Sequence, residues 1–140
     1  MKLCVSLTED TTAALVARMA ELAELADLFE VRADLVRDLD FRAVLAARVK
    51  PLLFTCMPES EGGRFPDADR EGRRRLLYEA IALGFDLVDV GVRDAFPDVV
   101  ASKAGRGLVL SWHDLDGTPD DLDGVYDRML QELESVGGYR

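Results

Sequence analysis

The sequence predicts an α/β protein built on a parallel sheet, and three observations support this prediction. Five short apolar runs alternate with stretches of helical periodicity. The 140 residues suit one domain with a real core over residues 1–140. Polar side chains that could take part in binding or catalysis stand at the ends of the apolar runs. Alternating strands and helices form right-handed βαβ units, and these units give a parallel sheet.

The five apolar runs are the expected strands because their length and β-branched content are typical of strands. They occupy residues 3–7, 28–31, 51–56, 87–90 and 108–112. Apolar side chains recur at helical spacing between the runs, so we expect helices at about residues 15–23, 41–45, 69–83 and 95–104.

The last helix carries the clearest sequence signals. Thr118 is the expected N-cap, and Pro119 suits the first turn. An apolar stripe then runs from Leu122 to Val136, and the glycines at 137–138 end the helix. Gly84 is the expected end of the third helix.

Two architectures fit this order of elements. A five-stranded doubly wound sheet uses a chain of this length fully, and length alone favours it. A closed (β/α)₈ barrel needs about 250 residues, so the chain would supply about five of its eight units. Helices on both faces of the sheet would indicate the doubly wound fold, whereas helices on one side of a curved sheet would indicate a partial barrel.

Composition narrows the class of protein. The 17 basic and 27 acidic residues give a net charge of −10, which argues against binding nucleic acid or anionic membranes. No apolar run reaches the roughly 18–20 residues of a membrane span. Cys4 and Cys56 each lie inside an apolar run, so we expect reduced, buried thiols in a cytoplasmic protein.

Polar residues gather where the strands end, which is where parallel α/β folds bind ligands. Alternation places Glu30 and Arg32 on one face of their strand, and it also pairs Ser111 with His113. The full set of strand-end residues is Ser6, Glu30, Arg32, Thr55, Asp89, Ser111 and His113.

Two of these residues have a functional and a structural interpretation. Arg32 could bind a carboxylate or hydroxyl of a small substrate, or it could form a structural pair with Glu30. His113 is the single histidine, and its intrinsic pKa near 6.5 suits proton transfer. The structural alternative for His113 is a turn residue before Asp114.

Two further segments have simpler interpretations. Glu61-Gly62-Gly63 follows the third strand and could bring a loop close to a ligand, although such a segment is usually only a turn. The arginines at 70, 73, 74 and 75 stand beside acidic residues, which predicts a solvated helix face.

Together these segments resemble the type I 3-dehydroquinate dehydratases. The matching stretches are KLCVSLT, LFEVRADLV, PLLFTC with EGGRF, LVDV and LVLSWHDLDGTP. They occur in the order typical of the family and cover nearly the whole chain. The resemblance implies a (β/α)₈ barrel, so it favours the N-terminal part of a barrel over the doubly wound sheet.

The resemblance also implies a reaction, the elimination of water from 3-dehydroquinate to give 3-dehydroshikimate in the shikimate pathway. In the family a lysine forms an imine with the substrate ketone, and a histidine moves the protons, without metal or dissociable cofactor. By position, His113 would be the general acid/base and Glu61 would orient it. Ser6, Glu30 and Arg32 would contact substrate.

The sequence departs from the family in three places. The imine-forming lysine belongs on a strand after the last helix seen here, and Lys2, Lys50 and Lys103 do not match its position. Met57 replaces an arginine that contacts substrate in the family, and Gly91 replaces a glutamate. We interpret these two changes as the joint loss of an ion pair, which avoids a stranded buried charge.

These departures set the functional expectations. We expect no turnover by this chain alone, with 3-dehydroquinate as the substrate of the completed site. The unpaired edges of an open sheet call for a homodimer or a complementing C-terminal half. The alternative is a non-catalytic degenerate homologue or an interaction module.

Overall fold

A computed structural model describes residues 1–94, 96–102 and 107–135, apart from the side chains at 133 and 135. Its strands form one parallel sheet in the order β1-β2-β3-β4-β5. The strands are β1 (Cys4–Leu7), β2 (Leu28–Arg32), β3 (Leu52–Thr55), β4 (Leu87–Gly91) and β5 (Leu108–Ser111). Each strand begins within one residue of the start of an expected apolar run.

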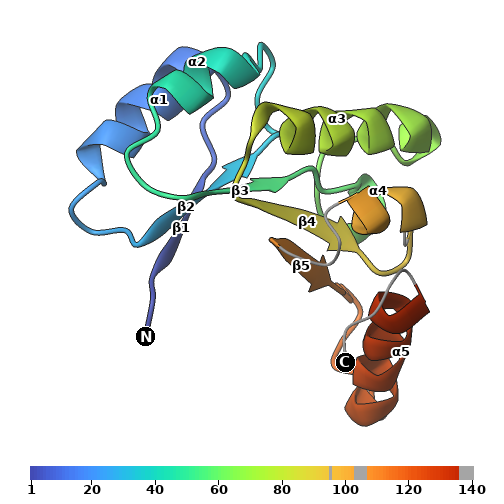
Figure 1. The fold of residues 1–140 in the computed structure, drawn as a ribbon. Coiled ribbons are helices and arrows are strands. Elements are labelled where there is room, and N and C mark those ends of the chain that lie inside the picture. The colour runs from blue at the N-terminus through green and yellow to red at the C-terminus, as the bar shows by residue number, and fades with distance from the viewer. Residues whose placement is uncertain (95, 103–106, 136–140) are drawn as a thin grey trace.

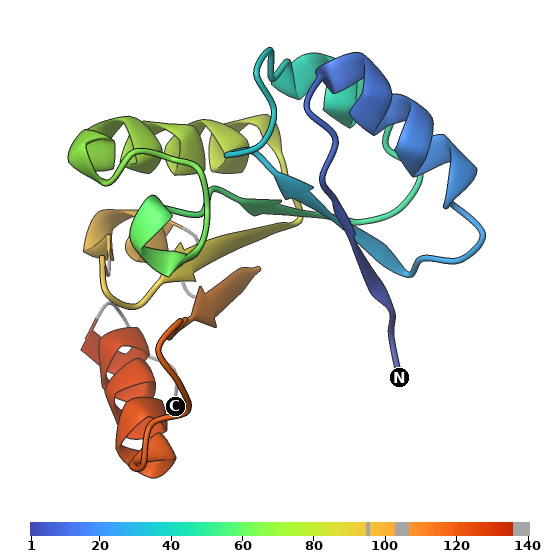
Figure 2. The ribbon, with the colours of Figure 1, turned by 180° about the vertical axis from the view of Figure 1, so that it is seen from behind.

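The strand order decides between the two architectures. The order never reverses, as it would at the switch point of a doubly wound sheet. The helices α1 to α4 follow one side of the curved sheet, and α5 lies beyond β5 (Figure 1). The view from behind shows no α-helix of the described chain on the other side (Figure 2). The prediction of a partial barrel is confirmed.

The helices begin and end where short polar side chains or glycine satisfy the backbone. Asp40 accepts hydrogen bonds from two amides at the start of α2, and Asp69 accepts one at the start of α3. Gly84 ends α3 with φ +97°. The helices are α1 (Thr12–Glu21), α2 (Phe41–Ala46), α3 (Arg70–Leu83), α4 (Pro97–Ser102) and α5 (Leu122–Ser135), with short 3₁₀ turns η1 (Glu59–Glu61) and η2 (Asp67–Asp69).

The hydrophobic core lies between the sheet and these helices. Alternate strand residues such as Phe29 and Val31 are fully buried on this side. Phe41, Phe54 and Phe85 pack together with ring centroids 5.2–5.9 Å apart. This packing fixes the strands, so the residues of opposite alternation must face the inside of the partial barrel.

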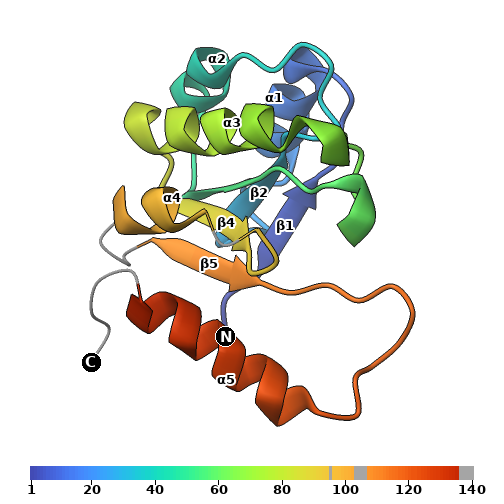
Figure 3. The same cartoon turned by 90° about the vertical axis from the view of Figure 1, so that its right-hand side faces the viewer.

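The start of α5 differs from the prediction. Thr118 and Pro119 lie in the loop before the helix, and Asp121 accepts a hydrogen bond of 2.8 Å from the amide of Gly124. An ionised carboxylate caps a helix well and also favours its positive end. Val125 is buried, but Leu122 is 54% exposed, and α5 lies apart from the other helices (Figure 3).

Some expected features fall on residues outside the described part. These are Val136 and the glycines at 137–138 after α5, and positions 95, 103 and 104 around α4. In the described residues, no helix is long and apolar enough to cross a membrane.

Two predictions about burial are wrong in part. Cys56 is a buried free thiol, but Cys4 is exposed because β1 is the edge strand and Cys4 faces the open side of the sheet. Arg70 and Arg75 are exposed as predicted, whereas Arg73 is only 5% exposed. Arg73 shares the inner face of α3 with Leu77 and Ala80, so the helix buries it.

Candidate active site

The inward face of the sheet carries several polar residues near the carboxyl ends of the strands. Ser6 stands opposite Glu30, and Arg32 stands opposite Thr55. Farther along the sheet, Gly91 stands opposite Ser111. The structure therefore places all the strand-end residues of the prediction on one surface, at the carboxyl ends of the strands.

His113 and Glu61 form the central contact of this surface. His113 Nδ1 lies 3.1 Å from Glu61 Oε2. The Glu61 side chain is 3% exposed and that of His113 is 35% exposed. A carboxylate at Nδ1 favours the tautomer that carries its proton there, and this leaves Nε2 free to accept a proton.

The two glycines after Glu61 explain how the loop reaches the histidine. Gly62 has φ +87°, a conformation that favours glycine. A Cβ on Gly63 would lie 2.0 Å from the carbonyl oxygen of Met57, so only glycine fits there. The loop therefore folds tightly against the end of β3 and presents Glu61 inward.

Glu30 and Arg32 do not form the structural pair that the sequence left open. The Ser6 hydroxyl donates to Glu30 Oε2. Arg32 instead donates to Asp34 through Nε (2.8 Å) and Nη2 (2.7 Å). Hydrogen bonding to Asp34 raises the pKa of Arg32, so the guanidinium keeps its charge and a fixed orientation.

Asp34 is a site residue that sequence reasoning missed. Its side chain is fully buried, and it also accepts hydrogen bonds from the amides of Met57 (3.3 Å) and Arg64 (3.1 Å). One carboxylate thus fixes Arg32 and both ends of the loop that holds Glu61. The available signal was its position two residues after Arg32.

Asp89 is the second missed residue, although its strand-end position was noted. Its Oδ1 atom is buried without a hydrogen-bond partner, as is the Thr55 hydroxyl oxygen. Burial raises the pKa of Asp89 to about 6; Ser111 and His113 oppose this rise, and Glu30 and Glu61 add to it. Asp89 therefore lies within electrostatic range of three predicted site residues.

The three departures from the family pattern can be located in the structure. Met57 and Gly91 line a narrow cavity of about 10 Å³ together with Glu61. Of the lysines in the described residues, Lys2 precedes β1 and Lys50 precedes β3, so both lie at the opposite end of the sheet. Lys103 lies outside the described residues.

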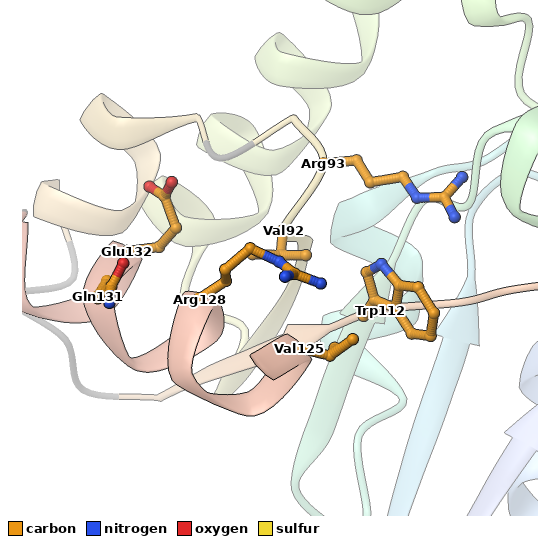
Figure 4. A pocket seen from close by; sticks show the side chains of 7 residues that line it. All are labelled: Val92, Arg93, Trp112, Val125, Arg128, Gln131 and Glu132. Atoms are coloured by element: carbon orange, nitrogen blue, oxygen red, sulfur yellow. The ribbon is translucent and has the colours of Figure 1, made fainter. Parts of the chain in front are cut away.

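A larger groove of about 390 Å³ lies between α5 and the residues after β4 and β5 (Figure 4). The Arg93 guanidinium lies over the Trp112 ring, 5.6 Å from its centroid. None of the predicted site residues lines this groove. Across the described residues, His, Cys, Asp and Glu side chains form no group of three or more that could hold a metal ion.

The fold and the site define a barrel-type α/β protein with a carboxylate–histidine pair at the carboxyl ends of its strands. The family model for "Type I 3-dehydroquinase" matches residues 3–135. The chain belongs to the type I 3-dehydroquinase family.

Curated relatives and solved structures agree with this assignment. A 3-dehydroquinate dehydratase of Desulfotalea psychrophila is 32% identical, and the match covers 97% of this chain and 62% of the relative. Type I 3-dehydroquinate dehydratase from Clostridium difficile aligns with a TM-score of 0.78 at 25% identity, over 94% of this chain and 59% of that one. The structure of 3-dehydroquinate dehydratase from Enterococcus faecalis aligns with a TM-score of 0.77 at 27% identity, over 94% of this chain and 62% of that one.

The chain therefore spans about three-fifths of these relatives. Other relatives carry the matching region within longer polypeptides. They include a bifunctional 3-dehydroquinate dehydratase/shikimate dehydrogenase of Arabidopsis thaliana and a pentafunctional AROM polypeptide of Komagataella phaffii.

Proposed function

We propose that residues 1–140 supply the acid–base half of a 3-dehydroquinate dehydratase active site. The observation that carries the proposal is the contact between Glu61 and His113 Nδ1, beside an inward face that bears Arg32 and Glu30. Family membership supports the proposed reaction, the elimination of water from 3-dehydroquinate to give 3-dehydroshikimate.

The proposed chemistry divides between this chain and an amine from elsewhere. A lysine condenses with the substrate ketone, releases water and forms an imine, which acidifies the neighbouring C–H. His113 Nε2 then takes the proton, and the electrons move into the imine. His113 returns the proton to the departing hydroxyl, so water leaves, and hydrolysis of the imine frees the product.

The other inward residues have positioning roles in this proposal. Arg32 faces the site with its charge fixed by Asp34 and would hold a carboxylate or hydroxyl of the substrate. Ser6 and Glu30, already joined by a hydrogen bond, would contact substrate hydroxyls. A metal or dissociable cofactor takes no part in this scheme.

The second part of the proposal concerns the polypeptide that covers the open side of the sheet. A polypeptide with the remaining βα units would pair with the sheet edges and bring the lysine to the carboxyl ends of the strands. A homodimer is the competing arrangement. Sedimentation of the purified chain distinguishes the two, since only the second gives a stable dimer without another polypeptide.

The decisive experiment joins this chain to the C-terminal part of the Enterococcus faecalis protein that it does not match. We expect the hybrid to form 3-dehydroshikimate, followed by its enone absorbance, and residues 1–140 alone to form none. A folded hybrid without turnover and without substrate binding would refute the proposal. Turnover by residues 1–140 alone would refute the division into two halves.

A non-catalytic homologue is the second candidate function, and Met57 and Gly91 are the observations that favour it. Methionine cannot bind an anion, and Met57 and Gly91 line a narrow cavity of about 10 Å³ together with Glu61. In this case the hybrid would fail to bind 3-dehydroquinate, and Met57→Arg with Gly91→Glu would restore binding.

A further inference from the structure

Arg73 is a buried cation for which the proposed mechanism has no role. It is 5% exposed, and Glu61 is 4% exposed. The two residues come from different elements, α3 and η1, and carry opposite charges. Both line the narrow cavity of about 10 Å³, together with Asp89 and Ser111. A buried arginine that shares a cavity with the carboxylate in contact with His113 calls for a physical explanation.

The surroundings hold the Arg73 side chain in one place. Its guanidinium pairs with Asp94, which Arg70 also contacts through Nε at 3.0 Å. The Phe96 ring lies beside both guanidinium groups, with its centroid 4.5 Å from Arg70 Cζ and 5.4 Å from Arg73 Cζ. Arg73 therefore cannot turn to solvent without loss of these contacts.

Arg73 carries a permanent positive charge at this position. Burial lowers its pKa, and the neighbouring Cys56 and Glu61 oppose this effect in part. Arginine remains protonated in proteins even when it is buried. The charge therefore persists whether His113 is neutral or protonated.

His113 and Gly91, which lie beside the two Glu61 carboxylate oxygens, carry no fixed charge. Oε2 faces His113 Nδ1 at 3.1 Å, and a neutral imidazole gives a hydrogen bond but no charge. The other side of the carboxylate faces Gly91, where a Cβ would lie 3.2 Å from Oε1. A buried carboxylate in this position is costly without a nearby cation.

We propose that Arg73 is a positioning residue whose charge, in the cavity that it shares with Glu61, stabilises the carboxylate that holds the imidazole proton on Nδ1 of His113. Nε2 is then free to take the substrate proton in every cycle. The inference rests on the proposed pairing of Glu61 with His113. It adds a third residue, from α3, to the pair formed by η1 and the segment that follows β5.

The test uses the fact that His113 is the only histidine, so ¹⁵N-histidine labelling gives one imidazole spectrum for the whole chain. The spectrum is recorded above the pH at which the imidazole loses its charge. Wild-type protein should show the proton on Nδ1. Arg73→Met should lose this preference and move the population toward Nε2–H, and Arg73→Lys should restore it.

Two controls separate the possible outcomes. Arg75→Met removes the same charge from the exposed face of α3 and should leave the spectrum unchanged, because the Arg75 side chain is 75% exposed. Glu61→Gln removes the carboxylate itself and should shift the proton. If Glu61→Gln has no effect, the pairing of Glu61 with His113 fails, and with it the proposed acid–base role.

An unchanged spectrum in a folded Arg73→Met protein that responds to Glu61→Gln would overturn the role of Arg73. Since Arg73→Met also leaves Asp94 without one partner, Arg73→Met with Asp94→Asn provides a second variant. Loss of folding in both variants would assign Arg73 a purely structural role, and this result would also count against the proposal.

Discussion

Replacement of Asp34 tests how the site is held together. Asp34→Ala removes the acceptor of four hydrogen bonds, two from Arg32 and one each from the amides of Met57 and Arg64. Breaking a buried ion pair costs about 3–5 kcal/mol. Because the Arg32 side chain keeps 18% exposure, we expect the lower end, a loss of about 3 kcal/mol in the free energy of unfolding.

Urea unfolding of the purified chain measures this loss. The matched control is Asp10→Ala, which removes an arginine–aspartate pair on the surface with side chains 72% and 65% exposed. Exposed pairs contribute at most about 1 kcal/mol. Asp34→Asn keeps one acceptor oxygen and the side-chain volume, so it should lose about 2 kcal/mol and still fold.

Hydrogen exchange adds a readout specific to the loop. In Asp34→Asn the amides of Met57 and Arg64 should exchange faster, while core amides of β2 and β3 change only with global stability. Equal stability losses in Asp34→Asn and Asp10→Ala, with unchanged exchange at these two amides, would refute the view that Asp34 fixes the loop.

Three further predictions concern neighbouring residues. Because the pKa of Asp89, about 6, lies above the ordinary 3.8, the folded state loses stability as pH rises from about 4 to about 6. Asp89→Asn should remove this loss, so the stability of the variant relative to wild type should rise by up to about 3 kcal/mol between pH 4 and pH 7 in urea titrations. A difference that does not change with pH would contradict the raised pKa of Asp89. Gly63→Ala should cost about 1–3 kcal/mol, since its Cβ would strike the Met57 backbone, and a neutral effect in the same titrations would show that the loop is less constrained. Met57→Arg alone should destabilise more than Met57→Arg with Gly91→Glu, and additive effects in a double-mutant cycle would remove the ion-pair interpretation.

The inward polar residues could be predicted from the sequence because strand alternation leaves little freedom. Phe29 and Val31 bury one side of β2, so Glu30 and Arg32 must face the other. Motif resemblance then supplied the number of units and the architecture, which length alone would have assigned to the doubly wound fold. The sequential strand order agrees with the resemblance.

The wrong or missed predictions depend on how segments distant in sequence pack together. Cys4 sits in an apolar run, but its position on an edge strand exposes it. Arg73 is one of four neighbouring arginines that were predicted to be solvated, although its spacing from Leu77 and Ala80 is that of a buried helix face. Asp34 is close to Arg32 in sequence, but its contacts with the loop after β3 depend on tertiary folding.

Imine trapping in the hybrid protein separates the acid–base role of His113 from formation of the imine. The hybrid carrying His113→Asn is mixed with 3-dehydroquinate and borohydride, which reduces an imine to a stable amine. We expect mass spectrometry to show covalent labelling of the lysine and the assay to show no 3-dehydroshikimate, because the imine forms but the substrate C–H proton is not removed. Turnover near that of the unsubstituted hybrid would contradict the acid–base role of His113.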